Sequence, residues 1–207
     1  MPLQELRSSK SGSIALWHIT EDEASLEKLA HESCPVNIIS PQKRLEWICG
    51  RILIAHLATS ANIPFLGIRK DEFGKPFLKE SNHHISLSHS YPYVAAQIHR
   101  DHSIGIDIEQ PKQKLLKIAP RILDANELED AGSDMVKHCI YWCAKEALYK
   151  VYGKRGLLFT NHLHIKPFEL KEAGELQGWI DANENQSFVD LCYLVTQDFV
   201  LVHSKTD

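Results

Sequence analysis

The pattern of hydrophobic and polar positions predicts two long amphipathic helices. The first spans residues 40–60, where Ser40 suits the N-cap, Pro41 suits the first turn, and apolar residues recur at helical spacing. The second spans residues 135–152 with the same period, and Gly153 is suited to end it. Shorter helices are expected at residues 21–31, 112–123 and 125–130.

Strict alternation of apolar and polar residues marks the candidate strands. In residues 84–90, Ile85 and Leu87 fall on one face, and the other face carries Ser86, Ser88 and Ser90. This segment and residues 93–99 and 103–109 are separated by short polar breaks, so they predict an antiparallel meander. Further strands are expected at residues 14–19, 63–68, 163–168, 177–180, 187–195 and 199–203.

Both halves of the chain contain one long helix that is followed by strands. A length of 207 residues suits either one large domain or two small ones. The shared order of elements favours an α+β fold of two similar halves, residues 1–105 and 106–207. Sequence identity between these halves is negligible, so the repeat concerns element order alone.

Composition excludes several classes of protein. The 43% of hydrophobic residues is too high for intrinsic disorder, and a net charge of −4 gives no general attraction to nucleic acid or anionic membranes. The beginning of the chain lacks the apolar core of a secretory signal, and no apolar run is long enough to span a bilayer. The five cysteines have irregular spacing, which favours reduced thiols and a cytoplasmic protein.

The sequence GIDIE at residues 105–109 places two carboxylates on one strand face. Asp107 and Glu109 are two residues apart, and Ile106 and Ile108 face the other way. Two neighbouring carboxylates can converge on a hard cation such as Mg²⁺ or Mn²⁺. A strand with one solvated acidic face explains the same spacing.

The sequence WCAKEALYK at residues 142–150 combines an apolar helical stripe with a bordering row of Trp142, Glu146 and Lys150. Lys145 points more nearly away from the centre of that stripe. Glu146 is therefore suited to supply a third carboxylate at the edge of a core. An ordinary Glu–Lys pair one turn apart on a helix surface remains an alternative.

Three further groups have the chemistry of phosphate ligands. Lys75 follows a glycine, and Ser88 and His89 provide donors on a strand. Arg44 and Arg51 lie two turns apart on one helix face, and guanidinium groups suit bidentate phosphate contacts. A turn, a strand of small residues and a solvated helix face explain the same residues without a ligand.

The order of these motifs resembles that of the Sfp-type 4′-phosphopantetheinyl transferases. GKP, SHS, GIDIE and WCAKEALYK follow one another between residues 74 and 150, and the last two are specific as a pair. The resemblance implies two α+β halves related by a pseudo-twofold, with coenzyme A bound between them in a monomer. It also implies transfer of the phosphopantetheine arm of coenzyme A to a serine of an apo acyl or peptidyl carrier protein, with release of 3′,5′-adenosine bisphosphate.

The resemblance assigns catalytic roles to Asp107, Glu146 and Lys150. Asp107, Glu109 and Glu146 match the acids that hold Mg²⁺ on the pyrophosphate. Glu146 also matches the residue that takes the proton of the attacking serine, directly or through water. Lys150 matches the lysine that stabilises the leaving pyrophosphate. A carboxylate close to a metal is a weak base, so the metal role of Glu146 has the stronger physical basis.

The remaining matches concern coenzyme A phosphates. Lys75 and His89 match positions that contact these phosphates, and Ser88 lies beside them in the same motif. Arg44 and Arg51 resemble helix positions near the 3′-phosphate. The family often has Asn where this chain has Ser86, so the pocket wall differs there.

Residues 111–123 combine basic and apolar side chains without an acid, and carrier proteins are generally acidic. We therefore expect a carrier-docking surface near Lys112, Lys114, Lys117 and Arg121, with apolar contacts from Leu115, Leu116, Ile118 and Ile122. An amphipathic surface helix without a partner is the alternative.

Three other interpretations fit parts of the sequence. A Mg²⁺-dependent phosphoanhydride hydrolase would activate water with the same carboxylates. A coenzyme A or nucleotide-binding module would need no catalysis. A zinc site that includes Cys139 and Cys143 is disfavoured, because their spacing does not match structural zinc motifs.

Overall fold

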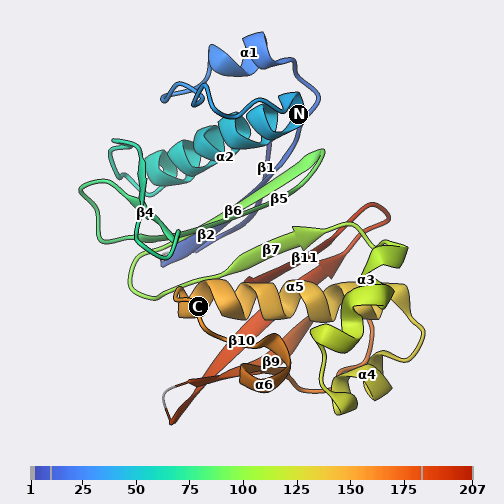
Figure 1. Cartoon of the computed structure of the whole chain (residues 1–207). Coiled ribbons are helices and arrows are strands. Elements are labelled where there is room, and N and C mark those ends of the chain that lie inside the picture. The colour runs from blue at the N-terminus through green and yellow to red at the C-terminus, as the bar shows by residue number, and fades with distance from the viewer. Residues whose placement is uncertain (1–2, 10, 183, 207) are drawn as a thin grey trace. The chain divides into compact units, whose positions relative to one another are not determined.

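The protein has an α+β architecture with two antiparallel sheets (Figure 1). The computed structural model describes residues 3–9, 11–182 and 184–206, so residues 1, 2, 10, 183 and 207 of the expected halves lie outside it. The chain divides into two compact units, one that extends to Ile104 and includes Thr206, and one that spans Gly105–Lys205. Each unit contains one long helix and one sheet. The predicted α+β class is confirmed.

The first unit is built on a six-stranded sheet with the order β1-β2-β6-β5-β4-β3. Its strands are β1 (Leu3–Ser8), β2 (Gly12–His18), β3 (Ile68–Lys70), β4 (Pro76–Leu78), β5 (His84–Ser90) and β6 (Tyr93–His99). Its helices are α1 (Glu23–Glu27) and α2 (Pro41–Ser60). The Ser40 hydroxyl accepts a hydrogen bond from the Lys43 amide, so α2 starts as its sequence predicts.

The two faces of β5 differ as the alternation predicts. Ile85 and Leu87 pack with α2 in a hydrophobic core that includes Ile48, Leu53 and Leu57. The opposite face of β5 and β6 is polar and buried, and it carries Ser86, Ser88, Gln97 and His99. Polar side chains are seldom buried, so this polar face of β5 and β6 is unusual.

The second unit is built on a five-stranded sheet with the order β7-β11-β10-β9-β8. Its strands are β7 (Ile106–Glu109), β8 (Leu163–Ile165), β9 (Ala173–Ala182), β10 (Asn185–Val195) and β11 (Val200–Ser204). Its α-helices are α3 (Gln113–Ile118), α4 (Ala125–Ala131), α5 (Met135–Tyr152) and α6 (Phe159–His162). Helix α5 starts with Asp134 as the N-cap and ends at Gly153, whose φ of 70° suits glycine.

Gly105 allows β7 to lie directly against α5. A Cβ atom at this position would collide with the backbone oxygen of Ala147, so no other residue fits without a shift of the helix. Strand β7 then pairs with β11, with Asp107 opposite Val202. Val202 belongs to the core that packs on α5, so Asp107 faces the same helix.

Two sequence-based expectations are wrong in detail. Residues 106–109 do not continue the meander of β5 and β6, because β7 pairs with β11 in the other sheet. Alternation identifies a strand but does not identify its partner. The helix expected over residues 112–123 is divided into α3 and a 3₁₀ turn, η1 (Ala119–Arg121). Pro120 explains the break, because proline cannot donate the hydrogen bond of a continuing α-helix.

The chain returns to the first unit after β11. Thr206 is 1% exposed, and its backbone oxygen accepts a hydrogen bond of 2.9 Å from the Ser11 hydroxyl. The first unit therefore includes residues from two distant parts of the chain.

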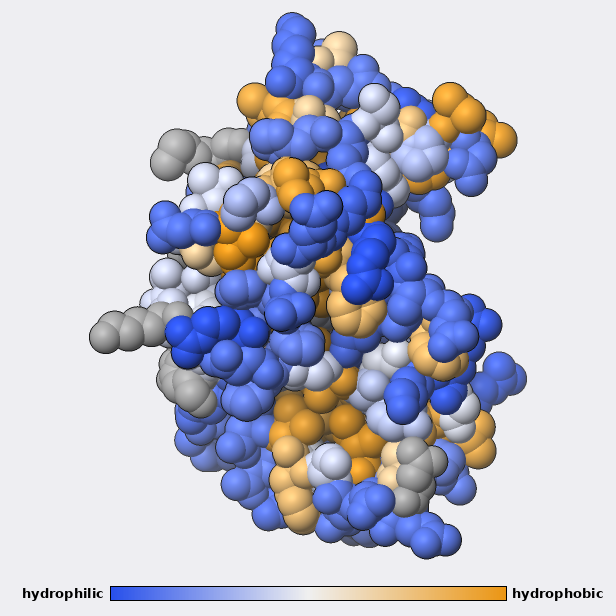
Figure 2. Space-filling model, turned by 90° about the vertical axis from the view of Figure 1, so that its left-hand side faces the viewer, coloured by the Kyte–Doolittle hydropathy of each residue, from blue (hydrophilic) through white to orange (hydrophobic). Residues whose placement is uncertain are grey.

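Figure 2 shows one face of the protein, on which hydrophilic residues predominate and smaller hydrophobic patches lie between them. All five cysteines are free thiols. In the described part of the chain, no helix is both long enough and apolar enough to cross a membrane.

Candidate functional site

The second unit brings Asp107, Glu146 and Lys150 together. The Lys150 Nζ atom donates a hydrogen bond of 2.8 Å to Asp107 Oδ1 and another of 2.7 Å to the Ile106 backbone oxygen. Asp107 is buried, with 6% of its surface exposed. Glu146 lies one turn before Lys150 on α5, as the helical row predicts. Strand β7 and helix α5 thus join two motifs that are far apart in the sequence.

Glu146 lies in an environment that disfavours its charge. Burial and the neighbouring negative charge of Asp107 raise the Glu146 pKa to about 7, and the positive charge of Lys150 partly offsets this rise. A carboxylate whose charge is disfavoured by a neighbouring carboxylate fits the binding of a divalent cation, because the cation would stabilise its ionised form. Oxygen donors of this kind suit Mg²⁺.

Glu109 stands apart from this group. Its Oε2 atom lies 3.0 Å from Lys114 Nζ on α3, and its Oε1 atom accepts a hydrogen bond from the Gln110 amide. Among the residues that the structure describes, no three His, Cys, Asp or Glu side chains are gathered closely enough to hold a metal. A three-carboxylate site therefore requires these side chains to rearrange.

Lys145 has a different role from its neighbour Glu146. Its side chain is fully buried, and its Nζ atom lies 2.5 Å from Glu127 Oε2. The same ammonium group donates hydrogen bonds to the backbone oxygens of Ile122 and Phe159.

Glu127, the acid of this pair, in turn accepts hydrogen bonds from the amides of Asp124 and Ile165. The Lys145–Glu127 pair thus connects α4, α5, α6 and β8. Burial raises the pKa of Glu127 and lowers that of Lys145, and their mutual attraction opposes both shifts.

The phosphate-binding candidates of the first unit do not share one face. Ser88 is buried on the polar face of β5, whereas His89 points to the face that packs on α2. Lys75 precedes β4, and its Nζ atom donates a hydrogen bond of 2.6 Å to the Ser103 hydroxyl. Burial lowers the Lys75 pKa. The motif residues Ser88 and His89 are adjacent in sequence but serve opposite sides of the sheet.

The two arginines of α2 are paired with acids. Arg44 Nε donates a hydrogen bond of 2.6 Å to Glu23 Oε1. Arg51 lies 3.6 Å from Glu32, and its guanidinium carbon lies 3.6 Å from the centre of a Trp47 ring. Burial lowers the Arg51 pKa. A phosphate that binds either arginine must therefore compete with a carboxylate.

Sequence reasoning missed the burial of two charged residues, one in each unit. Glu46 is a buried acid on α2 that contacts His89, and Lys145 is the buried base described above. Glu46 is three residues before Cys49 and seven before Leu53, so a charged residue on an apolar helix face was the available signal.

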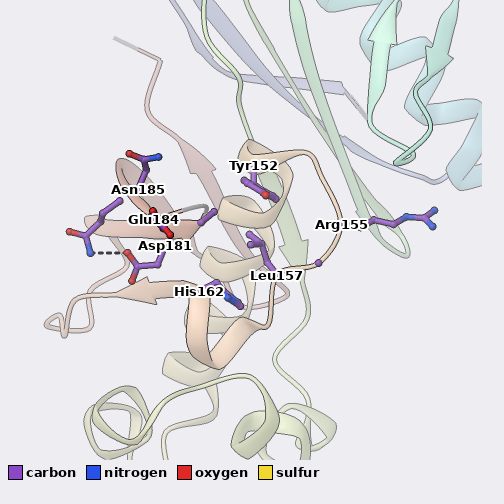
Figure 3. Close-up of a pocket in the computed structure, with 10 residues that line it drawn as sticks. Tyr152, Arg155, Leu157, His162, Asp181, Glu184 and Asn185 are labelled. Carbon is purple, nitrogen blue, oxygen red and sulfur yellow. Dashed lines mark hydrogen bonds between the residues drawn. The ribbon is translucent and has the colours of Figure 1, made fainter.

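A cavity of about 570 Å³ lies elsewhere in the second unit, between the end of α5 and the tip of the β9–β10 hairpin. Asp181, Tyr152, Leu157 and His162 are among the residues that line it, and Arg155 points away from the other labelled side chains (Figure 3). Asp181 accepts a hydrogen bond of 3.0 Å from Gln186 at the rim. None of the described lining residues belongs to the predicted site.

Comparison with known families gives the class of the protein. Residues 103–201 match the model of the 4′-phosphopantetheinyl transferase superfamily. The matched range contains Asp107, Glu109, Glu146 and Lys150. The chain belongs to this superfamily, and the resemblance of its motifs is confirmed at that level.

Three curated relatives have the same activity in their names. The 4′-phosphopantetheinyl transferase gsp of Aneurinibacillus migulanus is 31% identical over 150 residues, which cover 69% of this chain and 56% of the relative. The 4′-phosphopantetheinyl transferases psf-1 of Bacillus pumilus and ffp of Bacillus subtilis are 36% and 37% identical over 39% and 40% of this chain. These two alignments cover 37% and 39% of the relatives. The chain thus aligns with little more than half of the first relative and less than half of the other two.

Proposed function

We propose that the protein transfers the 4′-phosphopantetheine arm of coenzyme A to a serine hydroxyl of an apo carrier protein. The observation that supports this most is the cluster of Asp107, Glu146 and Lys150 within the range matched by the superfamily model. In the reaction, the serine oxygen forms a bond to the phosphorus next to pantetheine. The pyrophosphate bond breaks, and 3′,5′-adenosine bisphosphate leaves.

Asp107 and Glu146 would hold Mg²⁺ in this site, and Glu109 would complete the set after release from Lys114. Mg²⁺ bound there would supply Lewis acidity and orientation of the pyrophosphate for in-line attack. Lys150 carries a positive charge next to Asp107, where it would stabilise the negative charge of the leaving group. Glu146 would accept the serine proton, directly or through water. Lys75, Ser88, His89, Arg44 and Arg51 would bind the coenzyme A phosphates.

Intact-mass analysis after incubation with coenzyme A, Mg²⁺ and a panel of apo carrier proteins tests this function. The expected result is a gain of one phosphopantetheine arm on the carrier serine. Release of phosphopantetheine without carrier modification would instead support the hydrolase. Absence of modification across fatty-acid, polyketide and peptide-synthetase carriers would reject the transferase.

The carrier-docking surface proposed on α3 and η1 combines exposed cations with half-buried apolar side chains. Lys112, Lys114, Lys117 and Arg121 are all exposed, but Lys114 is also paired with Glu109, and Leu115 is buried in the core. Leu116 is half-buried beside these cations. Lys112 and Lys117 therefore offer the clearest test of docking.

Reversal of both charges, as Lys112→Glu with Lys117→Glu, is expected to raise the KM for an acidic carrier by about tenfold or more, because like charges replace complementary ones. Binding of coenzyme A is expected to stay unchanged. Steady-state kinetics with the carrier and calorimetric titration with coenzyme A measure the two effects. An unchanged KM for the carrier would place docking elsewhere. Lys28→Glu, an exposed reversal in the first unit, is the matched control.

A further inference from the structure

Helix α2 carries a carboxylate on its buried face. Glu46 is 4% exposed, and the neighbouring positions on this face are Cys49, Gly50 and Leu53, which are all buried. An ionised carboxylate is unfavourable in such a place unless partners compensate for the lost water. Glu46 has no assigned role in the proposed reaction.

The two oxygens of Glu46 have different partners. Oε1 accepts a hydrogen bond of 2.9 Å from Nε2 of Gln42, which is one turn earlier on the same helix and exposed. Oε2 lies 3.2 Å from Nδ1 of His89, which is near the end of β5. Glu46 thus links α2 to the motif residue His89.

This contact defines the roles of the two imidazole nitrogens. A carboxylate only accepts hydrogen bonds, so Nδ1 of His89 carries a proton where it meets Glu46. Nε2 is then the nitrogen that is left for a ligand. The His89 side chain is 46% exposed, whereas that of Glu46 is 5% exposed, so a ligand can reach the ring but not the carboxylate.

We propose that Glu46 is a positioning residue that fixes the His89 ring so that Nε2 meets a phosphate of coenzyme A. This inference rests on the proposed function, which places His89 at those phosphates. A proton on Nε2 makes the ring an imidazolium, with one N–H directed to Glu46 and the other to the phosphate. The ring then lies between two anionic acceptors, an arrangement comparable to the carboxylate partners that orient metal-binding histidines.

Glu46→Gln tests this role with little change in shape. Glutamine keeps the length of the side chain but removes the charge that holds the Nδ1 proton. The KM for coenzyme A is expected to rise by about tenfold, and kcat is expected to change by less than about twofold. The assay is steady-state kinetics with a carrier that the wild-type protein modifies. Gln42→Ala, which removes the other partner of Glu46, is the matched control and is expected to leave the KM unchanged.

A double-mutant cycle separates positioning from a general structural role. His89→Ala is expected to raise the KM for coenzyme A at least as much as Glu46→Gln does. In the His89→Ala background, Glu46→Gln is expected to have no further effect. An equal rise in KM in both backgrounds would overturn the proposal, because Glu46 would then act independently of His89.

The outcomes distinguish this inference from the proposed function. A wild-type protein that modifies no carrier rejects the function itself. A wild-type protein that modifies a carrier, with an unchanged KM in Glu46→Gln, rejects only the positioning role. A substitution at the buried Glu46 can impair folding, whereas His89 is half-exposed and tolerates substitution more easily. His89→Ala therefore tests the pair in that case as well. An unchanged KM for coenzyme A in His89→Ala overturns the inference by itself.

Discussion

Asp107→Asn is expected to lower the rate of carrier modification by at least about a hundredfold. Asparagine has nearly the same shape as aspartate but lacks its charge. The substitution removes the anion that lies 2.8 Å from Lys150 Nζ and one of the carboxylates that would hold Mg²⁺. The increase in carrier mass with time, measured at saturating coenzyme A, gives the rate.

Glu169→Gln is the matched control for loss of one negative charge in the same unit. Its side chain is 81% exposed, so the rate is expected to remain that of the wild-type protein. Urea unfolding of Asp107→Asn shows whether the buried position tolerates the amide. A folded Asp107→Asn protein with a rate within about tenfold of the wild type would remove Asp107 from the catalytic residues.

Lys145→Met is expected to lower the free energy of unfolding by about 3–5 kcal/mol. The substitution leaves the buried Glu127 carboxylate without its cation, and the backbone oxygens of Ile122 and Phe159 lose a donor. Urea denaturation followed by circular dichroism measures the loss. A decrease below about 1 kcal/mol would contradict the assignment of Lys145 as a buried structural link.

Lys171→Ala is the control for this measurement. Lys171 pairs with Glu169 at 3.0 Å, but both side chains are largely exposed, so the expected change is within about 0.5 kcal/mol. Replacement of Lys145 and Glu127 together by methionine is expected to restore only part of the stability. The reason is that the amides of Asp124 and Ile165 still lose the carboxylate that accepts their hydrogen bonds.

The long helices could be predicted from local sequence because the signals are local. Helix α2 has its N-cap and first-turn proline within two residues, and α5 ends at a glycine that adopts a left-handed conformation. The partners of strands that lie far apart in the chain could not be predicted from local sequence. Strand β7 pairs with residues 200–203, which are about 90 positions later, and alternation carries no record of such a partner.

In the candidate site too, the sequence predicts the local arrangement of residues but not the contacts between separate elements. Helical spacing and strand alternation were sufficient to place Glu146 beside Lys150 and to turn Asp107 away from its neighbouring isoleucines. The spacing could not show that Glu109 pairs with Lys114, or that Arg44 and Arg51 pair with acids of residues 23–32. These contacts depend on how separate elements pack, and charge alone does not reveal burial.

The position of Thr206 has a consequence for the order in which the protein forms during synthesis. Residues 11–104 leave the ribosome before the second unit, whereas Thr206 follows it. Translation at roughly 5–20 residues per second separates the two events by roughly 5–20 s. During this interval the Ser11 hydroxyl lacks the acceptor that it has in the folded protein. The first unit therefore acquires its hydrogen bond between Ser11 and Thr206 only after the second unit has been translated.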